Sequence, residues 1–304
     1  SLVGRTRVQR ARRPRNVSRP IPCAALHYPI DMDTRVQIPL GVTIAALGDT
    51  AAALAWVASR GIVGVQLSAT HPSMRPRDLG VSARRDLRAT LARYELVVTG
   101  IDAWIPSEHF IDPAHADRAI EAACAACEFA SEFGRVPVTL QLPRATSNAG
   151  ALSAVGPHAA GETSNAAQES HAARRHDAIG AIASAAERSG VTIADASGAA
   201  GAPWPPMGVS LDPAAVLAEG GDPVNMVSQL GPRLVSARVV DLLRSGMRGP
   251  VGAAGESRLD VLGFRVALEM AGLARFPVID ARQWLDPHAG VIATVQAWGG
   301  AIPV

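Results

Sequence analysis

A (β/α)8 barrel of the α/β class, the TIM barrel fold, is the architecture that this sequence of 304 residues predicts for residues 39–304. Short apolar runs alternate eight times with helical segments of about ten or more residues, which is the pattern of a closed parallel barrel. Residues 45–49 follow the first strand and read Ala-Ala-Leu-Gly-Asp. A Rossmann-type sheet, the competing architecture, would have a glycine-rich phosphate loop at that place.

The predicted strands are short apolar runs, several of which end on a polar or charged residue. Such runs, bounded by glycine and proline, are typical of buried parallel strands. In chain order they cover residues 40–44, 62–67, 96–101, 136–142, 190–195, 207–212, 234–241 and 276–280.

The predicted helices start at capping residues and stop at glycines. Asp49 or Thr50 caps the first helix, Asp112 and Pro113 precede the third, and Gly134 ends it. In chain order the helices cover residues 50–59, 83–93, 117–133, 174–189, 214–219, 224–230, 260–272 and 287–298.

The composition provides ample material for a core. Hydrophobic residues make up 48% of the chain and charged residues 18%, which excludes global disorder. The formal net charge is +2 and every basic residue is arginine, a balance that does not by itself indicate a nucleic-acid binder. No run approaches the ~18 apolar residues of a membrane helix, so we expect no membrane span.

Two of the three cysteines, Cys124 and Cys127, have the spacing of a metal-binding pair. They lie in an alanine-rich predicted helix with no second ligand pair nearby, which favours buried thiols over zinc. Without a disulfide framework, a reducing, cytoplasmic compartment is expected.

Residues 1–38 are predicted to form a basic N-terminal arm. Residues 1–25 contain seven arginines and no acidic residue, and their prolines prevent a long helix. No apolar segment follows Arg12 and Arg13, so an export signal is not indicated. The arm is either a solvated tail or a contact for an acidic partner or a neighbouring subunit, with nucleic acid the least favoured partner.

Three predicted loops follow strands at the barrel mouth. Residues 143–173 are long and polar, and suit a lid, a subunit contact or an unstructured excursion. Residues 196–206 carry Trp204 between prolines, which suits packing across the mouth. Residues 242–259 are glycine-rich, and these glycines indicate turns and not a nucleotide site.

Residues 207–241 resemble the xylose isomerase-like barrels, a superfamily of sugar and sugar-phosphate isomerases, epimerases and endonuclease IV-type enzymes. Leu211-Asp212-Pro213 precedes a helix, and Arg238-Val-Val-Asp241 ends the next strand. Members usually show Asp-Pro-x-His and His-x-Lys-Asp at these places. Here Ala215 and Arg238 stand in place of the two histidines.

The resemblance implies one divalent metal, usually held by a Glu, an Asp, a His and a Glu at four strand ends. These positions correspond to Asp195, Asp212, Arg238 and Asp280. A guanidinium only donates hydrogen bonds and cannot ligate a cation. We therefore predict that Arg238 neutralises the three aspartates in place of a metal. In the alternative, Arg238 points away and the aspartates are ordinary polar groups at strand ends.

Four residues are predicted to contact a sugar-like small molecule, if one is bound. Gln66 stands where the family has a glutamate on the second strand, and can donate a hydrogen bond but not act as a base. Arg244 lies six residues after Arg238, where some sugar epimerases have an arginine. Trp104 can stack on a sugar face or fill the top of the barrel, and Arg238 itself is the fourth.

Three functional hypotheses follow. The leading one is a pseudoenzyme with a degenerate active site and no cofactor, which acts as a binding or assembly subunit. It would bind a protein partner or self-associate through the arm and residues 143–173. The alternative is an isomerase or epimerase of sugars or sugar phosphates, with Mn²⁺ or Mg²⁺ held by Asp195, Asp212 and Asp280, and with Asp195 and Asp280 in acid/base roles. A phosphodiester hydrolase of the endonuclease IV kind is weaker, because its histidine-rich metal cluster has no counterpart in the sequence.

Overall fold

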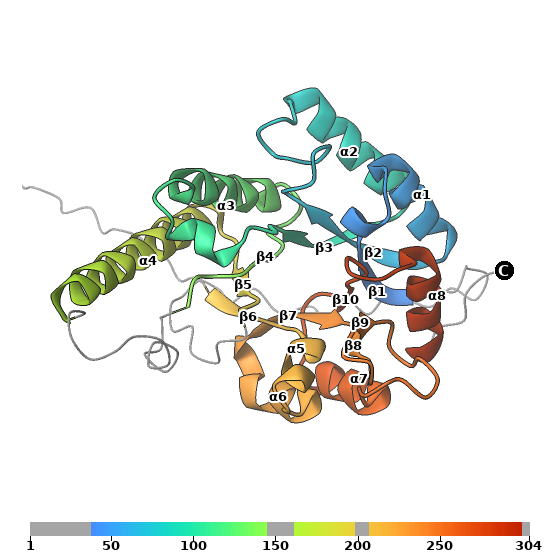
Figure 1. Cartoon of the computed structure of the whole chain (residues 1–304). Helices are drawn as coiled ribbons and strands as arrows, with labels where there is room; N and C mark the ends of the chain where they lie inside the picture. Colours follow the sequence, from blue (N-terminus) through green and yellow to red (C-terminus); the bar gives the residue numbers. More distant parts are fainter. Residues whose placement is uncertain (1–37, 145–160, 198–206, 300–304) are drawn as a thin grey trace, which may run out of the picture. The chain divides into compact units, whose positions relative to one another are not determined.

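The computed structural model of the protein describes residues 38–144, 161–197 and 207–299. Eight parallel strands close into a barrel in the order β1-β10-β7-β6-β5-β4-β3-β2 (Figure 1), which confirms the predicted (β/α)8 barrel. The strands are β1 Ile38–Thr43, β2 Ile62–Ser68, β3 Val97–Asp102, β4 Val138–Leu140, β5 Ile193–Asp195, β6 Met207–Leu211, β7 Leu234–Val239 and β10 Val278–Ile279. All of the predicted N-terminal arm except Ile38 lies outside the described residues.

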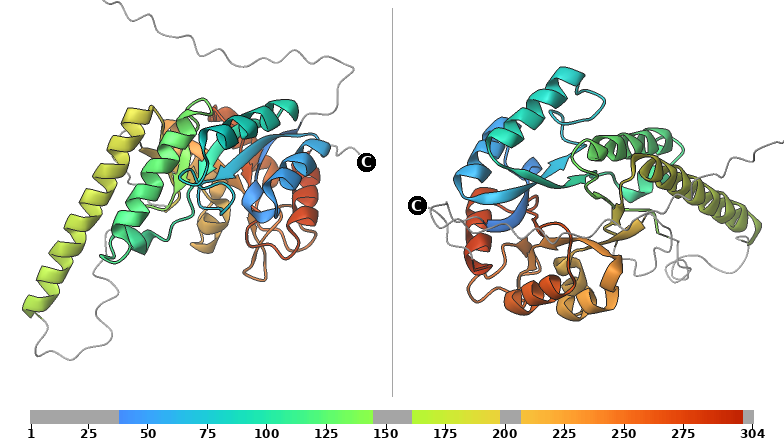
Figure 2. Two further views of the ribbon diagram at one scale, coloured as in Figure 1. Left: turned by 90° about the horizontal axis from the view of Figure 1, so that it is seen from above. Right: turned by 180° about the vertical axis from the view of Figure 1, so that it is seen from behind.

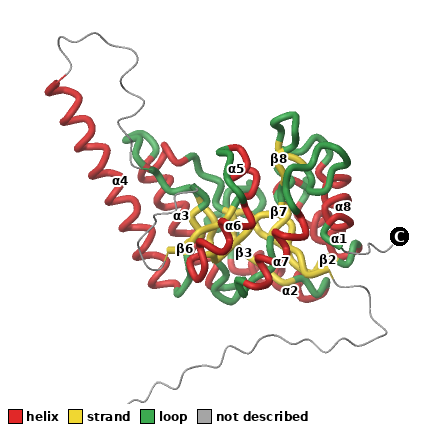
Figure 3. The backbone as a smooth tube through the Cα atoms, turned by 90° about the horizontal axis from the view of Figure 1, so that it is seen from below, coloured by secondary structure: helices red, strands yellow, loops and turns green. Residues whose placement is uncertain are grey.

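Figure 3 shows the strands, in yellow, at the centre of the molecule and the helices, in red, around them. Most bounds agree with the sequence prediction to within two residues. The helices are α1 Thr50–Ser59, α2 Val81–Arg93, α3 Ala116–Ser131, α4 Gly161–Ser189, α5 Pro213–Ala218, α6 Pro223–Leu230, α7 Val261–Met270 and α8 Pro287–Ala297. Within the described ranges, no helix combines the length and the apolar character that crossing a membrane requires.

Helix α4 corrects one prediction. It begins at Gly161 and not at residue 174, so residues 161–173, assigned to a loop, are helical. This segment contains four alanines and two glutamates, which favour a helix even without an apolar face. Its N-terminal part extends beyond α3 in Figure 2. Residues 145–160, the remainder of the predicted excursion, lie outside the described residues, as do residues 198–206 with Trp204.

Local turn chemistry explains several element boundaries. Asp49 caps α1 by accepting a hydrogen bond from the Ala52 N–H at 3.0 Å. Gly61 (φ 71°) and Gly190 (φ 65°) follow α1 and α4 in the left-handed conformation, where a side chain would be strained. These glycines let each helix turn at once into the next strand.

The interior of the barrel contains a polar layer below the mouth. The Thr43 hydroxyl donates to Oε1 of Gln66 at 2.7 Å, and Nε2 of Gln66 donates to the Thr139 hydroxyl at 3.4 Å. All three side chains are buried. Gln66 thus links β1, β2 and β4 through the barrel interior, immediately beneath the ends of the strands.

The two cysteines of α3 are free thiols. Cys127 is fully buried and Cys124 is half-buried. Burial raises the pKa of Cys127 to about 12. Such a thiol stays protonated at neutral pH and behaves as a small apolar core residue.

Candidate functional site

The carboxyl ends of the parallel strands meet at the barrel mouth, where this architecture holds its functional groups. Asp102 is the last residue of β3, and Arg238 lies in β7 opposite Val278 of β10. Asp280 directly follows β10. Asp212 directly follows β6, and its Oδ1 caps α5 by accepting from the Ala214 N–H at 3.1 Å. Side chains from four strand ends therefore converge.

Arg238 lies among three of these carboxylates. Its Nη1 donates to Oδ2 of Asp280 at 2.8 Å and lies 3.6 Å from Oδ2 of Asp212. Its Nη2 lies 3.9 Å from Oδ1 of Asp102. The Arg238 side chain is only 7% exposed, so this charge is neutralised within the protein and not by water.

Arg282, two residues after Asp280, adds a second guanidinium. It donates to both oxygens of Asp280, from Nε at 2.8 Å and from Nη2 at 2.7 Å. Its Nη1 donates to Oδ2 of Asp102 at 2.8 Å and so joins the ends of β3 and β10. The ring of Trp104 covers this guanidinium, with its centroid 4.0 Å from the central carbon of Arg282.

Arg248 supplies the third guanidinium from outside the barrel strands. It lies on β9 Arg248–Gly249, which pairs with β8 Asp241–Leu242 in an antiparallel hairpin. Its Nη1 and Nη2 donate to the two oxygens of Asp212 at 3.2 and 2.8 Å. This bidentate geometry is the one in which arginine binds a carboxylate most specifically.

Asp241 holds the chain that follows this hairpin in place. Its buried carboxylate accepts hydrogen bonds from the Ser257 hydroxyl, from the Arg258 N–H at 3.1 Å and from the Leu259 N–H at 3.0 Å. Asp241 is the residue that matches the family's His-x-Lys-Asp motif. In this structure it anchors the segment between β9 and α7.

We call these six residues the mouth cluster: Asp102, Asp212, Asp280, Arg238, Arg248 and Arg282. Three guanidiniums meet three carboxylates, so the formal charge of the cluster is zero. Burial alone would raise the pKa of Asp280, but Arg238, Arg282 and Arg248 outweigh it and hold this pKa well below its ordinary value. Burial raises the pKa of Asp102, which Arg282 and Arg238 offset only in part.

Asp195 lies at the end of β5 but has different partners, so the prediction that Arg238 neutralises it together with Asp212 and Asp280 is wrong for Asp195. Its Oδ1 accepts from the Leu142 N–H at 3.2 Å and from the Ser197 N–H at 2.9 Å, and its Oδ2 accepts from the Ser197 hydroxyl at 2.7 Å. Within the described ranges no ion pair joins Asp195 to an arginine of the mouth cluster. The carboxylate fixes the loops that follow β4 and β5.

The other predicted ligand contacts are distributed differently. Gln66 is buried, and its amide is engaged by Thr43 and Thr139. Trp104 is 46% exposed above the mouth cluster. Arg244 lies in the turn between β8 and β9 and is exposed, next to Ser257 and Arg258 of the segment that follows β9. None of the mouth-cluster ion pairs involves it.

Sequence reasoning missed Asp102, Arg248 and Arg282. Asp102 directly follows the predicted third strand, and Arg282 lies two residues after Asp280, so proximity to strand ends was a usable signal for both. Arg248 lies within the predicted loop of residues 242–259 and carried no such signal. Among the described residues, no group of three or more His, Cys, Asp or Glu is arranged to hold a metal ion.

Several solved structures that are similar to this chain are named as sugar isomerases or epimerases. A xylose isomerase domain protein from Planctomyces limnophilus matches with a TM-score of 0.60 and 15% identity, over 86% of this chain and 93% of that chain. An L-ribulose 3-epimerase matches with a TM-score of 0.60 and 16% identity, over 86% and 93%. A sugar phosphate isomerase/epimerase from Parabacteroides distasonis matches with a TM-score of 0.58 and 14% identity, over 88% and 95%.

These similarities establish the fold. The chain has the fold of the xylose isomerase-like, sugar phosphate isomerase/epimerase TIM barrels, as its sequence motifs predicted. A scan against protein-family models gives no match, and a search of curated proteins gives none either.

Proposed function

We propose that this xylose isomerase-like barrel works without a divalent metal and acts as a binding or assembly subunit. The observation that supports the proposal is the position of Arg238, 2.8 Å from Asp280 and 3.6 Å from Asp212. Asp212 and Asp280 are two of the carboxylates that the metal-dependent alternative requires. In this chain both are the partners of guanidiniums.

The donor set of the mouth cluster does not fit Mn²⁺ or Mg²⁺. Mg²⁺ needs oxygen ligands at about 2.0–2.1 Å, whereas all four oxygens of Asp212 and Asp280 accept guanidinium N–H groups. An added cation would also face three positive charges, of which that of Arg238 is buried and those of Arg248 and Arg282 are partly buried. Two unit charges 4 Å apart repel by about 4 kcal/mol at an effective dielectric constant of ~20.

The acid/base roles considered for Asp195 and Asp280 also lack support from the geometry. A general base needs a free lone pair within reach of a substrate proton. Both oxygens of Asp280 are held by Arg282, and Asp195 accepts two hydrogen bonds at Oδ1 and one at Oδ2, which leaves Oδ2 of Asp195 a single further lone pair. The carboxylates of Asp195 and Asp280 thus serve to connect neighbouring strands and loops of the barrel.

A metal-dependent isomerase or epimerase remains the second candidate. Aspartates at the ends of β5, β6 and β10, together with similar solved structures named as epimerases and isomerases, favour it. This candidate requires Arg238 and Arg282 to leave Asp280 when metal and sugar bind. Arg244, exposed at the mouth-side hairpin, would then be available to a sugar-like ligand.

The assembly role has one supporting feature among the described residues. Helix α4 extends beyond α3 in Figure 2, and Glu169, Ser170, Ala172 and Ala173 on it are exposed. This part of α4 falls within residues 143–173, the segment predicted to contact a protein partner or a second copy of the chain. The N-terminal arm, the other predicted contact, lies outside the described residues.

Calorimetric titration of Mn²⁺ into the purified full chain tests the metal part of the proposal. We expect no stoichiometric binding and no rise in melting temperature. Binding that is abolished by Asp280→Asn but unaffected by Asp86→Asn, which alters an exposed carboxylate on α2, would overturn the proposal in favour of the isomerase.

Sedimentation of the full chain and of a variant lacking residues 1–25 tests the assembly part. We expect the truncation to lower the number of chains per particle, while the melting temperature of the barrel stays the same. The same number of chains per particle in both proteins would remove the arm from the proposal.

A further inference from the structure

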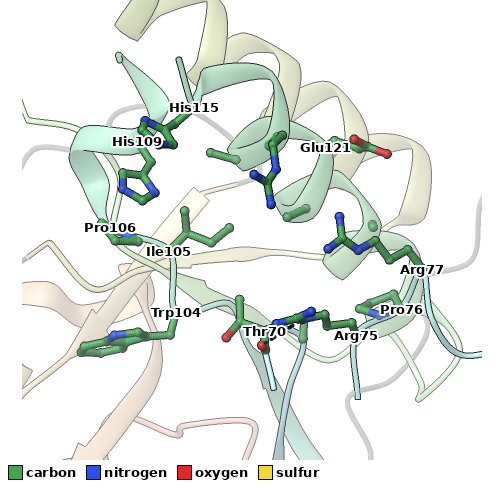
Figure 4. Close-up of a pocket in the computed structure, with 15 residues that line it drawn as sticks. Thr70, Arg75, Pro76, Arg77, Trp104, Ile105, Pro106, His109, His115 and Glu121 are labelled. Carbon is green, nitrogen blue, oxygen red and sulfur yellow. Dashed lines mark hydrogen bonds between the residues drawn. The ribbon is translucent and has the colours of Figure 1, made fainter. Parts of the chain in front are cut away.

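A second group of arginines lies at the rim of the barrel, outside the mouth cluster (Figure 4). It is a cavity of about 400 Å³ between the loop after β2, the loop after β3 and helix α3. We call it the rim cavity. Small-molecule sites of proteins have volumes of ~300–1,000 Å³, so the rim cavity has the size of such a site.

Three arginines line the rim cavity, and they lack the partners that the mouth arginines have. Arg75 uses its Nε for the Thr70 carbonyl at 3.4 Å, and Arg77 lies 3.8 Å from exposed Asp78. Arg118 has no carboxylate partner among the described residues. Arg77 and Arg118 are exposed and Arg75 is half-buried, so these charges meet mainly solvent and not buried carboxylates.

One acidic residue, Glu121, also lines the cavity. In Figure 4 its carboxylate points away from the space, whereas the side chain of Arg77 points into it. With histidines neutral, three arginines against one glutamate leave the lining with a net charge of +2. Like charges around one partly open space repel one another, and a bound anion relieves this repulsion.

The remaining walls combine apolar residues with two histidine rings. Trp104 and Pro106 form one side, and Ile105 is buried beneath them. His109 and His115 stack with their ring centroids 4.5 Å apart, and Nδ1 of His115 is 2.5 Å from Oδ2 of Asp112. These walls suit a planar or apolar body and not a free inorganic ion.

We infer that the rim cavity binds a small organic phosphate, with its dianionic head at Arg75, Arg77 and Arg118 and its body against Trp104. Guanidiniums bind phosphate oxygens through paired N–H groups, and a dianion matches the net charge of +2 better than a monoanionic carboxylate does. This site uses different residues from the proposed function and does not depend on the loss of the metal.

Phenyl phosphate is a suitable probe, because it combines a phosphate monoester with a flat apolar ring. In calorimetric titration of the full chain at low salt, we expect a Kd of about 1 mM or tighter. Inorganic phosphate and benzoate should bind at least about tenfold more weakly, which corresponds to ~1.4 kcal/mol, and phenol should not bind.

Arg118→Ala should weaken phenyl phosphate binding at least about tenfold, whereas Arg85→Ala should leave it unchanged. Arg85 is an exposed arginine on α2 that does not line the cavity, so it matches Arg118 in charge and exposure. Equal losses in both variants, or unchanged binding in Arg118→Ala, would overturn the inference by showing general charge attraction. Benzoate binding as tightly as phenyl phosphate would overturn the assignment to phosphate.

The two proposals fail separately. Mn²⁺ binding that depends on Asp280 would end the metal-free proposal and leave the phosphate site standing. Phenyl phosphate that does not bind would end the phosphate site and leave the mouth cluster as described.

Discussion

The mouth cluster and the rim cavity each contain three arginines at the carboxyl end of the barrel, and they differ in what neutralises them. In the mouth cluster, Arg238, Arg248 and Arg282 meet three aspartates, and Arg238 is only 7% exposed. In the rim cavity, Glu121 is the one acidic side chain that lines the space, and it points away. An arginine that is paired with carboxylates of the protein stabilises the fold, whereas an arginine without such a pair can bind an external anion.

Trp104 contacts the mouth cluster and also lines the rim cavity. Its ring stacks on Arg282 of the mouth cluster, while it also forms a wall of the rim cavity. The stacked guanidinium of Arg282 is held by Asp102 and Asp280, so the Trp104 ring packs on a side chain whose position is fixed by hydrogen bonds. The neutral cluster therefore orients the aromatic wall of the charged cavity.

The largest expected effect is on stability and comes from Arg238→Met. Removing one partner of a buried ion-pair network leaves carboxylates without compensation, which costs about 3–5 kcal/mol. Urea unfolding followed by circular dichroism measures the change, with Arg85→Met as the control, expected within about 0.5 kcal/mol of the parent. A loss below about 1 kcal/mol for Arg238→Met would mean that Arg282 and Arg248 suffice to neutralise the mouth.

The sequence predicted the barrel well because alternation of apolar strands and helices reports local burial. It also identified Arg238, Asp212 and Asp280, because each lies in or directly after a predicted strand. It could not identify Arg248, since a hairpin within residues 242–259 brings this residue to the mouth and only tertiary contacts set that path. The helical start of α4 was missed because a solvated helix lacks the apolar periodicity that prediction relies on.

The second prediction concerns pH and Asp280. Its pKa is lowered in the folded protein, so its stabilising contribution is complete above the ordinary value of 3.8 and is lost as the pH falls toward the folded value. Asp280→Asn should therefore cost most near pH 6 and least near pH 2, with the difference from the parent shrinking by on the order of 2 kcal/mol. Urea unfolding at both pH values measures this.

Asp102→Asn is the matched comparison for that experiment. Burial raises the pKa of Asp102, so its stabilising contribution is complete below the ordinary value of 3.8 and is lost as the pH rises through the folded value. Its difference from the parent should not shrink on acidification. The same acid dependence in both variants would contradict the unequal neutralisation of the two carboxylates.

The smallest expected effect comes from Arg118→Ala in the rim cavity. Arg118 has no carboxylate partner among the described residues, so its removal breaks no ion pair and relieves repulsion from Arg75 and Arg77. The free energy of unfolding should stay within about 0.5 kcal/mol of the parent, or rise slightly at low salt where screening is weakest. Urea unfolding at two salt concentrations measures it. A loss comparable to that of Arg238→Met would show that Arg118 is neutralised inside the protein, and the contrast between the two regions would then disappear.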